Sequence, residues 1–283
     1  MNDKPIPNWV SKYLEKLYLS IPEKPSYEFL TLFSERHLST LPFENVSKLI
    51  YFSKFNINRY YIPSMETYVE SLFKHDYGGT CYVLNQYAHK LLSFLGYDCS
   101  LVNLDRGHIG ILVKLPEFPA ERLYLDVGAA APILKPVRFE NKDNSSKYSV
   151  DEIQILPDAE QEGYYRFTRY RNEKFLTNTW IFNPNISFSK QNLDESIQNS
   201  FKSDAFFMTK LRVDLFQLEH GRILSLNNNK FTIRTEDLQE TVTILNSIEE
   251  VESVIDKEFG LSKLPVRKAV EILKGFGVDI FET

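Results

Sequence analysis

The chain has 283 residues, of which 43% are hydrophobic and 25% charged, so its composition is that of a folded globular protein and excludes wholesale disorder. Its net charge of −5 argues against general nucleic-acid binding, which needs a basic surface. Two cysteines, Cys81 and Cys99, cannot form a disulfide framework for a chain of this size.

The first hundred residues are predicted to be mainly helical, because apolar side chains recur at helical spacing. Serine precedes the second helix, a Gly-Gly hinge leads into the fourth, and Gly96 is a natural stop for it. Pro42 marks a break, with an extended or turn segment around it. The predicted helices cover residues 9–19, 27–37, 64–73 and 81–95.

From Tyr97 onward the pattern changes to short strands separated by turns, and two helices follow near the C-terminus. We expect a polar loop over residues 140–150, and the whole chain has the organisation of an α+β protein. The predicted strands cover residues 100–104, 108–113, 122–127, 164–170, 179–182, 210–216, 222–226 and 230–234, and the predicted C-terminal helices cover 248–259 and 265–275.

Cys81 is the most informative residue because the sequence Gly78-Gly79-Thr80 places it at the start of a helix. The positive end of the helix dipole and the unpaired amide groups there favour a thiolate, and the glycines permit close approach of a substrate. A free cysteine is more often a small buried hydrophobic residue. That ordinary interpretation is kept for Cys99, which has no comparable setting.

A thiolate nucleophile needs a nearby imidazole and a third group that orients the ring. Among the five histidines, His108 stands out because it opens an apolar strand, whereas the other four fit surface or structural roles. Asp126 follows at the end of the next predicted strand, where it is either an orienting carboxylate or a loop cap. The order Cys81, His108, Asp126 is the order of papain-like thiol enzymes.

These segments together resemble the arylamine N-acetyltransferase family, in particular its bacterial members. The resemblance runs from about residue 30 to residue 235. Its strongest part is Gly-Gly-x-Cys-x-x-x-Asn, from Gly78 to Asn85, and a weaker echo runs from Phe206 to Arg234. The other matching stretches are Leu41-Pro42-Phe43-Glu44-Asn45, the strand that begins at His108, and Leu125-Asp126-Val127-Gly128.

The resemblance implies a papain-like Cys-His-Asp fold with an N-terminal helical bundle (1–97), a central β-barrel (98–203) and a C-terminal α/β lid (204–283). It implies that Cys81, His108 and Asp126 form a catalytic triad. Acetyl would pass from acetyl-CoA to Cys81 and then, by a ping-pong mechanism, to an arylamine, arylhydrazine or arylhydroxylamine.

Residues outside the triad are also assigned by the resemblance. Phe43 and Ala129 are candidates for binding the acceptor, with plain core packing as the alternative for Phe43, and Gly128 and Ala130 are candidates for contacting CoA. Because CoA is strongly negative and the chain is acidic, a local basic patch is needed. Lys135 and Arg138 are candidates for that patch, although solvated surface residues are the commoner explanation.

The sequence departs from the family pattern at three places. Tyr77 replaces the usual arginine before the glycines, so we expect Glu44 to have lost that partner and the hinge to be less rigid. The alternative is that the Tyr77 hydroxyl donates one hydrogen bond and the loop is held differently. Val83 replaces a usual glutamate, and Ala129-Ala130 replaces a usual Phe-Gly. The missing aromatic side chain predicts a wider acceptor pocket.

Two other classes of function keep most of these features. One is an amide synthase or thiol hydrolase that uses the same triad without CoA, and the other is a catalytically inactive binding relative. We expect no metal site, nucleic-acid partner or membrane partner, and a monomer or homodimer. The first ten residues carry an acid and two prolines rather than an apolar run, which predicts a cytoplasmic protein.

Overall fold

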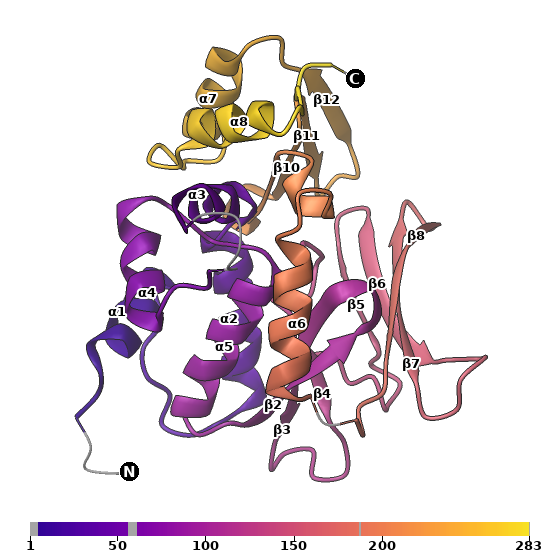
Figure 1. Cartoon of the computed structure of the whole chain (residues 1–283). Helices are drawn as coiled ribbons and strands as arrows, with labels where there is room; N and C mark the ends of the chain where they lie inside the picture. The colour runs from indigo at the N-terminus through magenta and orange to yellow at the C-terminus, as the bar shows by residue number, and fades with distance from the viewer. Residues whose placement is uncertain (1–4, 56–60, 187, 283) are drawn as a thin grey trace.

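The first part of the chain is a bundle of five helices, seen at the left of Figure 1. The computed structural model describes residues 5–55, 61–186 and 188–282. All four predicted N-terminal helices are confirmed, and a fifth, α3, was not predicted. The bounds are α1 (Asn8–Lys16), α2 (Tyr27–Thr40), α3 (Val46–Phe55), α4 (Met65–Lys74) and α5 (Cys81–Phe94).

Serine caps fix the starts of two of these helices. Ser26 Oγ accepts a hydrogen bond from the Phe29 amide, and Ser64 Oγ accepts one from the Thr67 amide, each at 3.2 Å. Each cap satisfies an amide that has no partner within its helix. The apolar faces of α1, α2, α4 and α5 then share one core cluster with the first strands that follow them.

The strands form three separate sheets. The first has the order β2 (Asp98–Leu104), β3 (His108–Lys114) and β4 (Leu123–Leu125), and packs against α5. The second is an antiparallel series, β5 (Ser145–Tyr148), β6 (Asp151–Pro157), β7 (Tyr165–Arg171) and β8 (Lys174–Phe182). Residues 140–150 are therefore not all loop, because β5 pairs with β6 through residues 145–148.

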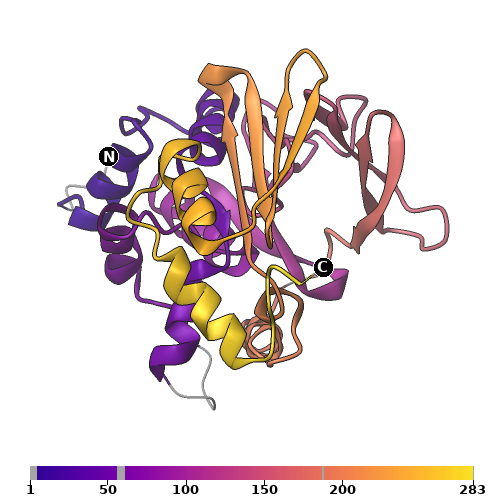
Figure 2. The same ribbon diagram turned by 90° about the horizontal axis from the view of Figure 1, so that it is seen from above.

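The third sheet pairs one strand from the N-terminal part of the chain with four strands from its C-terminal part. Its order is β1 (Phe43–Glu44), β9 (Arg212–Gln217), β10 (Arg222–Asn227), β11 (Lys230–Thr235) and β12 (Glu240–Ile244). In Figure 2 its orange strands stand beside the pink β5–β8 strands. The cross-strand register places Phe43 opposite Asp214, Asp214 opposite Ser225, and Ser225 opposite Thr232, so these four residues form one row across the sheet.

The prediction of a central β-barrel is wrong. In the described part of the chain, β2–β4 and β5–β8 form two open sheets, and no ladder closes them into one. β4 is only three residues long, and the segment after it returns to the sheet through a single isolated bridge between Tyr124 and Val137. Too few residues pair at this edge to carry the sheet around into a barrel.

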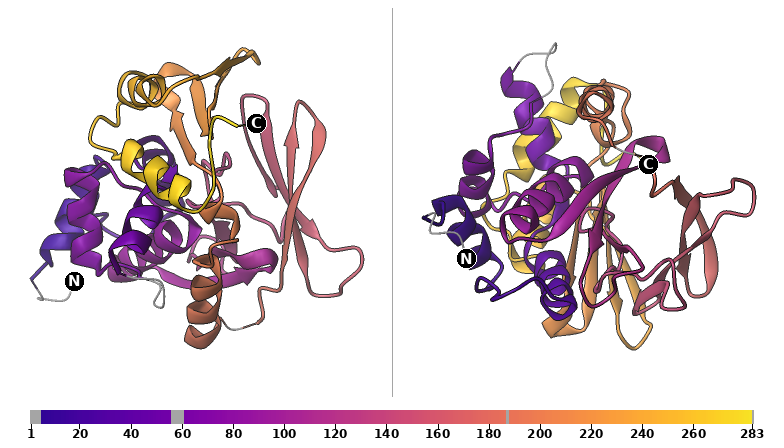
Figure 3. Two further views of the ribbon diagram at one scale, coloured as in Figure 1. Left: turned by 45° about the horizontal axis from the view of Figure 1, so that its top comes forward. Right: turned by 90° about the horizontal axis from the view of Figure 1, so that it is seen from below.

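Three further helices complete the fold. They are α6 (Lys190–Ser200), α7 (Ile248–Lys257) and α8 (Val266–Gly275). α8 crosses over α3, as both views in Figure 3 show, and the two share a core cluster with the third sheet. The N-terminal segment thus contributes α3 to the C-terminal core and β1 to the third sheet, and the domain limits at 97 and 203 stay a prediction. No helix within the described ranges is both long and apolar enough to cross a lipid bilayer.

Candidate functional site

Cys81 is the first residue of α5, as the sequence predicts. Thr80 is the N-cap residue, and its carbonyl accepts hydrogen bonds from the amides of Val83 and Leu84 at 2.9 and 3.0 Å. The thiol therefore lies at the positive end of a fourteen-residue helix. Its side chain is only 6% exposed, in a cluster with Tyr82, Ile109 and Ile197 of α6.

The hinge before Cys81 is held by Glu44, whose donors are other groups than the arginine that the family pattern supplies. Glu44 is fully buried, and its carboxylate accepts hydrogen bonds from the Gly78 amide at 3.1 Å and from both the amide and the hydroxyl of Ser47. The Glu44 amide in turn donates to the Gly79 carbonyl at 3.0 Å. Tyr77 instead packs edge-on against Tyr51. Backbone amides and Ser47 thus supply donors to the acid.

His108 and Asp126 are in direct contact. His108 Nε2 lies 2.6 Å from Asp126 Oδ2, and both side chains are buried. Since Asp126 engages Nε2, Nδ1 is the ring nitrogen left for Cys81, whose side chain lies close enough to contribute to the raised pKa of His108. The structure therefore brings the three predicted residues together.

Asp126 is fixed by three further hydrogen bonds. Its Oδ2 accepts from the Tyr124 hydroxyl at 2.7 Å, and its Oδ1 accepts from Asn85 Nδ2 and from the Gly128 amide, both at 2.8 Å. Tyr124 lies two residues before Asp126, and this spacing could have identified it from the sequence. Asp126 is thus saturated with donors and cannot turn away from His108.

Asn85 explains the spacing of the motif Gly-Gly-x-Cys-x-x-x-Asn. It lies four residues after Cys81 and so on the same face of α5. Besides Asp126, its amide nitrogen donates to the Ile109 carbonyl at 2.7 Å, and its oxygen accepts from the Val127 amide at 3.0 Å. One buried side chain therefore ties the helix that bears the cysteine to the strands that position the histidine and the acid.

The environment makes His108 and Asp126 an ion pair. Burial alone would lower the pKa of His108, but the Asp126 carboxylate and the Cys81 side chain outweigh it and raise the pKa to about 10. Burial likewise opposes the charge on Asp126, yet His108, Asn85 and Tyr124 together hold its pKa below the usual value. At neutral pH the site therefore contains an imidazolium beside a carboxylate.

Two glycines make this packing possible. A Cβ on Gly128 would lie 2.7 Å from Cys81 Cα and 2.9 Å from Asn85 Nδ2, so any side chain there would push the acid-bearing loop off α5. A Cβ on Gly110 would lie 2.6 Å from the Tyr124 ring, which crosses the strand at that point. Gly128 therefore has a clear packing role beside the thiol, whereas its predicted contact with CoA stays a prediction.

The remaining predicted site residues surround this centre. Phe43 is buried and meets Phe207 edge-on, with ring centroids 5.3 Å apart. Ala129 is 5% exposed within an apolar cluster, and Ala130 has a positive φ of 48°. The cavities between α5 and β2, beside Lys48 and beside Phe118 are lined by other residues, so the roles of these three toward substrates stay predictions.

Two residues beside the centre were missed from the sequence. The Trp180 ring stacks on the His108 ring with centroids 4.1 Å apart and an angle of 11°. Lys48 is 6% exposed; its ammonium donates to Ser200 Oγ at 2.7 Å, and its burial lowers its pKa to about 7. No local sequence signal marks either residue, because each reaches the site from a distant element.

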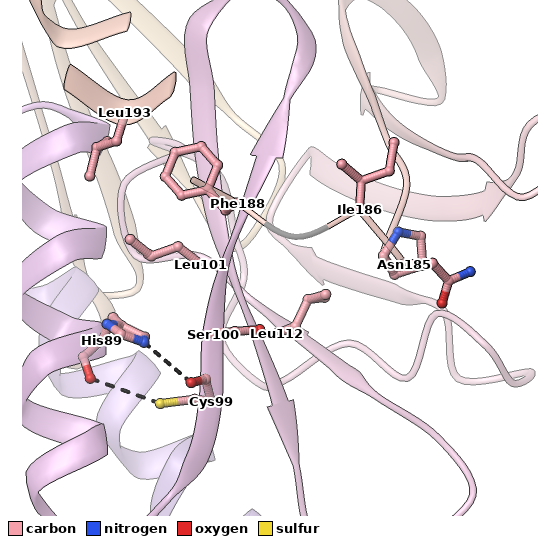
Figure 4. Close-up of a pocket in the computed structure, with 10 residues that line it drawn as sticks. His89, Cys99, Ser100, Leu101, Leu112, Asn185, Ile186, Phe188 and Leu193 are labelled. Atoms are coloured by element: carbon pink, nitrogen blue, oxygen red, sulfur yellow. Dashed lines mark hydrogen bonds between the residues drawn. The ribbon is translucent and has the colours of Figure 1, made fainter. Parts of the chain in front are cut away.

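A separate cavity of about 490 Å³ lies between α5, β2 and the segment before α6. Figure 4 shows His89 and Cys99 at one end, where His89 Nε2 lies 3.2 Å from the Cys99 carbonyl oxygen. Leu101, Phe188 and Leu193 line the cavity and also pack against the cluster around Cys81. The contacts of Cys99 are with His89 and Ser93 rather than with the triad, and the expectation that only Cys81 is chemically special stays a prediction.

The other histidines do not join the site. His37 is buried against the Tyr13 hydroxyl at 3.0 Å, while His75 and His220 are exposed. Across residues 5–55, 61–186 and 188–282, no group of three or more His, Cys, Asp or Glu side chains is placed to hold a metal ion.

Known structures with the same fold include bacterial arylamine N-acetyltransferases. The enzyme from Salmonella typhimurium has a TM-score of 0.73 and 18% identity, with 91% of this chain and 93% of that chain covered. A Bacillus cereus enzyme, described as having a Cys-His-Glu triad, has a TM-score of 0.72 and 19% identity, covering 91% and 100%. The Mycobacterium marinum enzyme in complex with CoA has a TM-score of 0.74 and 15% identity, covering 94% and 97%.

The sequence itself also matches a known family. No curated protein matches the chain, but the family model described as N-acetyltransferase matches residues 26–266. That range contains the hinge, α5, all three sheets and the first residue of α8. The chain therefore belongs to the arylamine N-acetyltransferase family of transferases.

Proposed function

We propose that this chain transfers an acetyl group from acetyl-CoA to the nitrogen of an arylamine or arylhydrazine, or to the oxygen of an N-arylhydroxylamine, through an acetyl-Cys81 intermediate. The observation that carries the proposal is the 2.6 Å contact between His108 and Asp126 beside a cysteine at a helix N-terminus. The CoA bound to the M. marinum structure supports the choice of donor.

In the first half-reaction, the imidazolium of His108 and the start of α5 favour the thiolate of Cys81. The sulfur attacks the thioester carbonyl, and the tetrahedral intermediate collapses by breaking the bond to the CoA sulfur. The leaving thiolate takes the proton of the imidazolium. Cys81 then carries the acetyl group, and His108 is neutral.

In the second half-reaction, the acceptor amine attacks the acetyl carbonyl. An aromatic amine is weakly basic and therefore unprotonated, so it can attack without prior deprotonation. Neutral His108 takes the proton from the attacking nitrogen as the bond to Cys81 Sγ breaks. This step restores the thiolate and imidazolium, while Asp126 holds the ring in place and stabilises its charge.

The direct test is to mix the purified protein with acetyl-CoA and measure its intact mass, then locate any adduct by peptide mapping. We expect the mass of one acetyl group on Cys81 and its loss when aniline is added, with acetanilide as the product. Cys81→Ala should prevent the adduct, and Cys99→Ser is the matched control that should leave it unchanged.

The outcomes separate the alternatives. An adduct that decays in water as fast as with aniline would indicate a thiol hydrolase. Absence of both adduct and free CoA, with any arylamine tested, would refute acetyl transfer and favour a donor other than CoA or a non-catalytic role.

A further inference from the structure

The negative net charge leaves open where the phosphates of a CoA-type donor would bind. The two cations suggested by the sequence are both neutralised. Lys135 Nζ lies 2.7 Å from Asp143 Oδ1, and Arg138 is ion-paired with Glu121 and stacked on Phe118. Neither residue offers a free charge to a phosphate.

A surplus of positive charge lies instead between the second and third sheets. We call this group the arginine cluster: Arg169 and Arg171 on β7, Arg212 on β9 and Arg234 on β11. The acids within it are Asp151 and Asp214. Two more charged residues lie at its margins: Lys210 repels Arg212, and Glu240 attracts Arg234. The positive charge of Lys210 and the negative charge of Glu240 cancel in the net charge of the cluster.

The two aspartates do not satisfy the four arginines. Asp151 is shared, with its Oδ1 2.7 Å from Arg171 Nε and its Oδ2 3.0 Å from Arg234 Nε. Asp214 is chelated by Arg212 on its own strand. The Arg234 side chain is 7% exposed, and its Nε has no hydrogen-bond acceptor despite the ion pair.

Arg169 makes no ion pair with any side chain in the described ranges. Its guanidinium donates to the carbonyls of Ala129 at 3.3 Å and Ala130 at 2.7 Å, so its hydrogen-bond acceptors among the described residues are neutral backbone groups. Arg169 is half-buried, and a cation partly removed from water is stabilised when an anion lies beside it. The excess of arginines over aspartates therefore makes the cluster a favourable place for an anion to bind.

The cluster adjoins the catalytic centre. The carbonyls that hold Arg169 belong to the two residues after Gly128, which packs directly on Cys81. On the third sheet, Asp214 lies opposite Phe43 in the cross-strand register, so the cluster and the proposed acceptor residue share a face. The side chains of Arg171 and Arg212 are 33% and 28% exposed, which gives solvent access to the cluster.

We propose that the arginine cluster binds phosphate groups of the acyl donor. The planar guanidinium fork suits phosphate oxygens, and the surplus of two charges, from four arginines and two aspartates, matches a phosphate dianion. The assignment of these phosphates to the acyl donor rests on the proposed function, whereas the ability of the cluster to bind phosphate does not.

The test compares donors with and without phosphates in the variant Arg171→Gln. This variant leaves Asp151 paired with Arg234, so no buried acid is orphaned. The donors are acetyl-CoA, acetyl-dephospho-CoA and S-acetyl-pantetheine, which carries no phosphate. We expect kcat/KM for acetyl-CoA relative to S-acetyl-pantetheine to fall about tenfold, the effect of losing one charge-assisted hydrogen bond.

Arg222→Gln is the matched control. Arg222 is also a sheet arginine paired with an acid, at 3.1 Å from Glu258, but it alternates with Ile223 and so lies on the other face from Arg234. We expect the donor ratio to stay unchanged in this variant. Acetyl-dephospho-CoA shows which phosphate is bound, because it lacks the 3′-phosphate and retains the diphosphate.

Failure of this proposal and failure of the proposed function give different results. An equal loss with all three donors in Arg171→Gln, or no loss with any, overturns the phosphate site while acetyl transfer stands. If no donor acetylates the wild type, calorimetry with inorganic pyrophosphate decides. Binding that weakens about tenfold in Arg171→Gln and not in Arg222→Gln supports the site, and absence of binding overturns it.

Discussion

Replacing Asp126 by asparagine tests how far the charge of this residue, rather than its shape, organises the site. The carboxylate accepts four hydrogen bonds, from His108 and Tyr124 on Oδ2 and from Asn85 and the Gly128 amide on Oδ1. An asparagine has one oxygen, so at least two of these four donors would face an NH₂ group. Because the Asn85 amide and the Gly128 amide are fixed donors, we expect the new NH₂ group to face His108.

The consequence for chemistry is a change of tautomer. A neutral imidazole can accept from the new NH₂ group only through Nε2, which puts its proton on Nδ1, the nitrogen left for Cys81. It then cannot accept a proton from the thiol, and the imidazolium is no longer stabilised. We expect the rate of acetylation to fall by about a thousandfold or more, on the order of the loss seen when the orienting acid of a triad is neutralised.

The consequence for stability depends on pH. Losing one partner of a buried ion pair costs about 3–5 kcal/mol. The pKa of His108 is raised from 6.5 to about 10, so this stabilisation is fully present below pH 6.5 and is lost as pH rises toward 10. The pKa of Asp126 is lowered from 3.8, so its contribution is present above that value and is lost as pH falls below it.

Urea unfolding of the wild type and Asp126→Asn across this pH range measures the difference directly. We expect the difference in the free energy of unfolding between the two proteins to be largest between about pH 4 and pH 6.5, and to decrease at lower and at higher pH. Asp143→Asn is the matched control, since that acid pairs with Lys135 at the surface. A gap that does not change with pH, or an Asp126→Asn enzyme that retains wild-type acetylation, would refute this account of the pair.

Three other substitutions probe the surroundings of the centre. Gly128→Ala should lower both stability, by about 2 kcal/mol, and activity, because its Cβ would lie 2.7 Å from Cys81 Cα; unchanged melting and turnover would contradict the close packing. Ala129→Phe should change the preference among acceptor amines, and an identical acceptor profile would defeat the idea of a widened pocket. Trp180→Leu should slow alkylation of Cys81 by iodoacetamide severalfold, since a stacked ring stabilises the His108 cation by about 1 kcal/mol, while Trp180→Phe should retain most of the rate.

Much of the catalytic centre could be predicted from the sequence because local spacing encodes it. The Gly-Gly-Thr segment before Cys81 marks a helix start. Four residues later, Asn85 falls on the same helix face, and Tyr124 and Asp126 stand two residues apart. Side chains two residues apart in a strand, or four apart in a helix, lie on the same face of that element whatever the tertiary structure, so such short spacings can be read from the sequence. The order Cys81, His108, Asp126 then indicated which elements meet.

The sequence was less informative where the outcome depends on pairing between distant segments. Whether the strands close into a barrel depends on how many residues pair with β4, which is only three residues long. No local sequence pattern predicts that the segment after it pairs with β4 only through the bridge between Tyr124 and Val137. The donors that replace the arginine at Glu44 could not be named either, because the missing arginine is visible in the sequence while the contact with the Gly78 amide is not.

Length, composition and net charge thus determined that the chain is globular, acidic and poor in cysteine, and local motifs determined which thiol matters. Only the tertiary structure decided how the charges are distributed. Four arginines from three strands gather around two aspartates, although they lie up to 65 positions apart in the chain, counting from Arg169 to Arg234. Net charge sums over the whole surface, whereas a binding site depends on which side chains the sheets bring face to face.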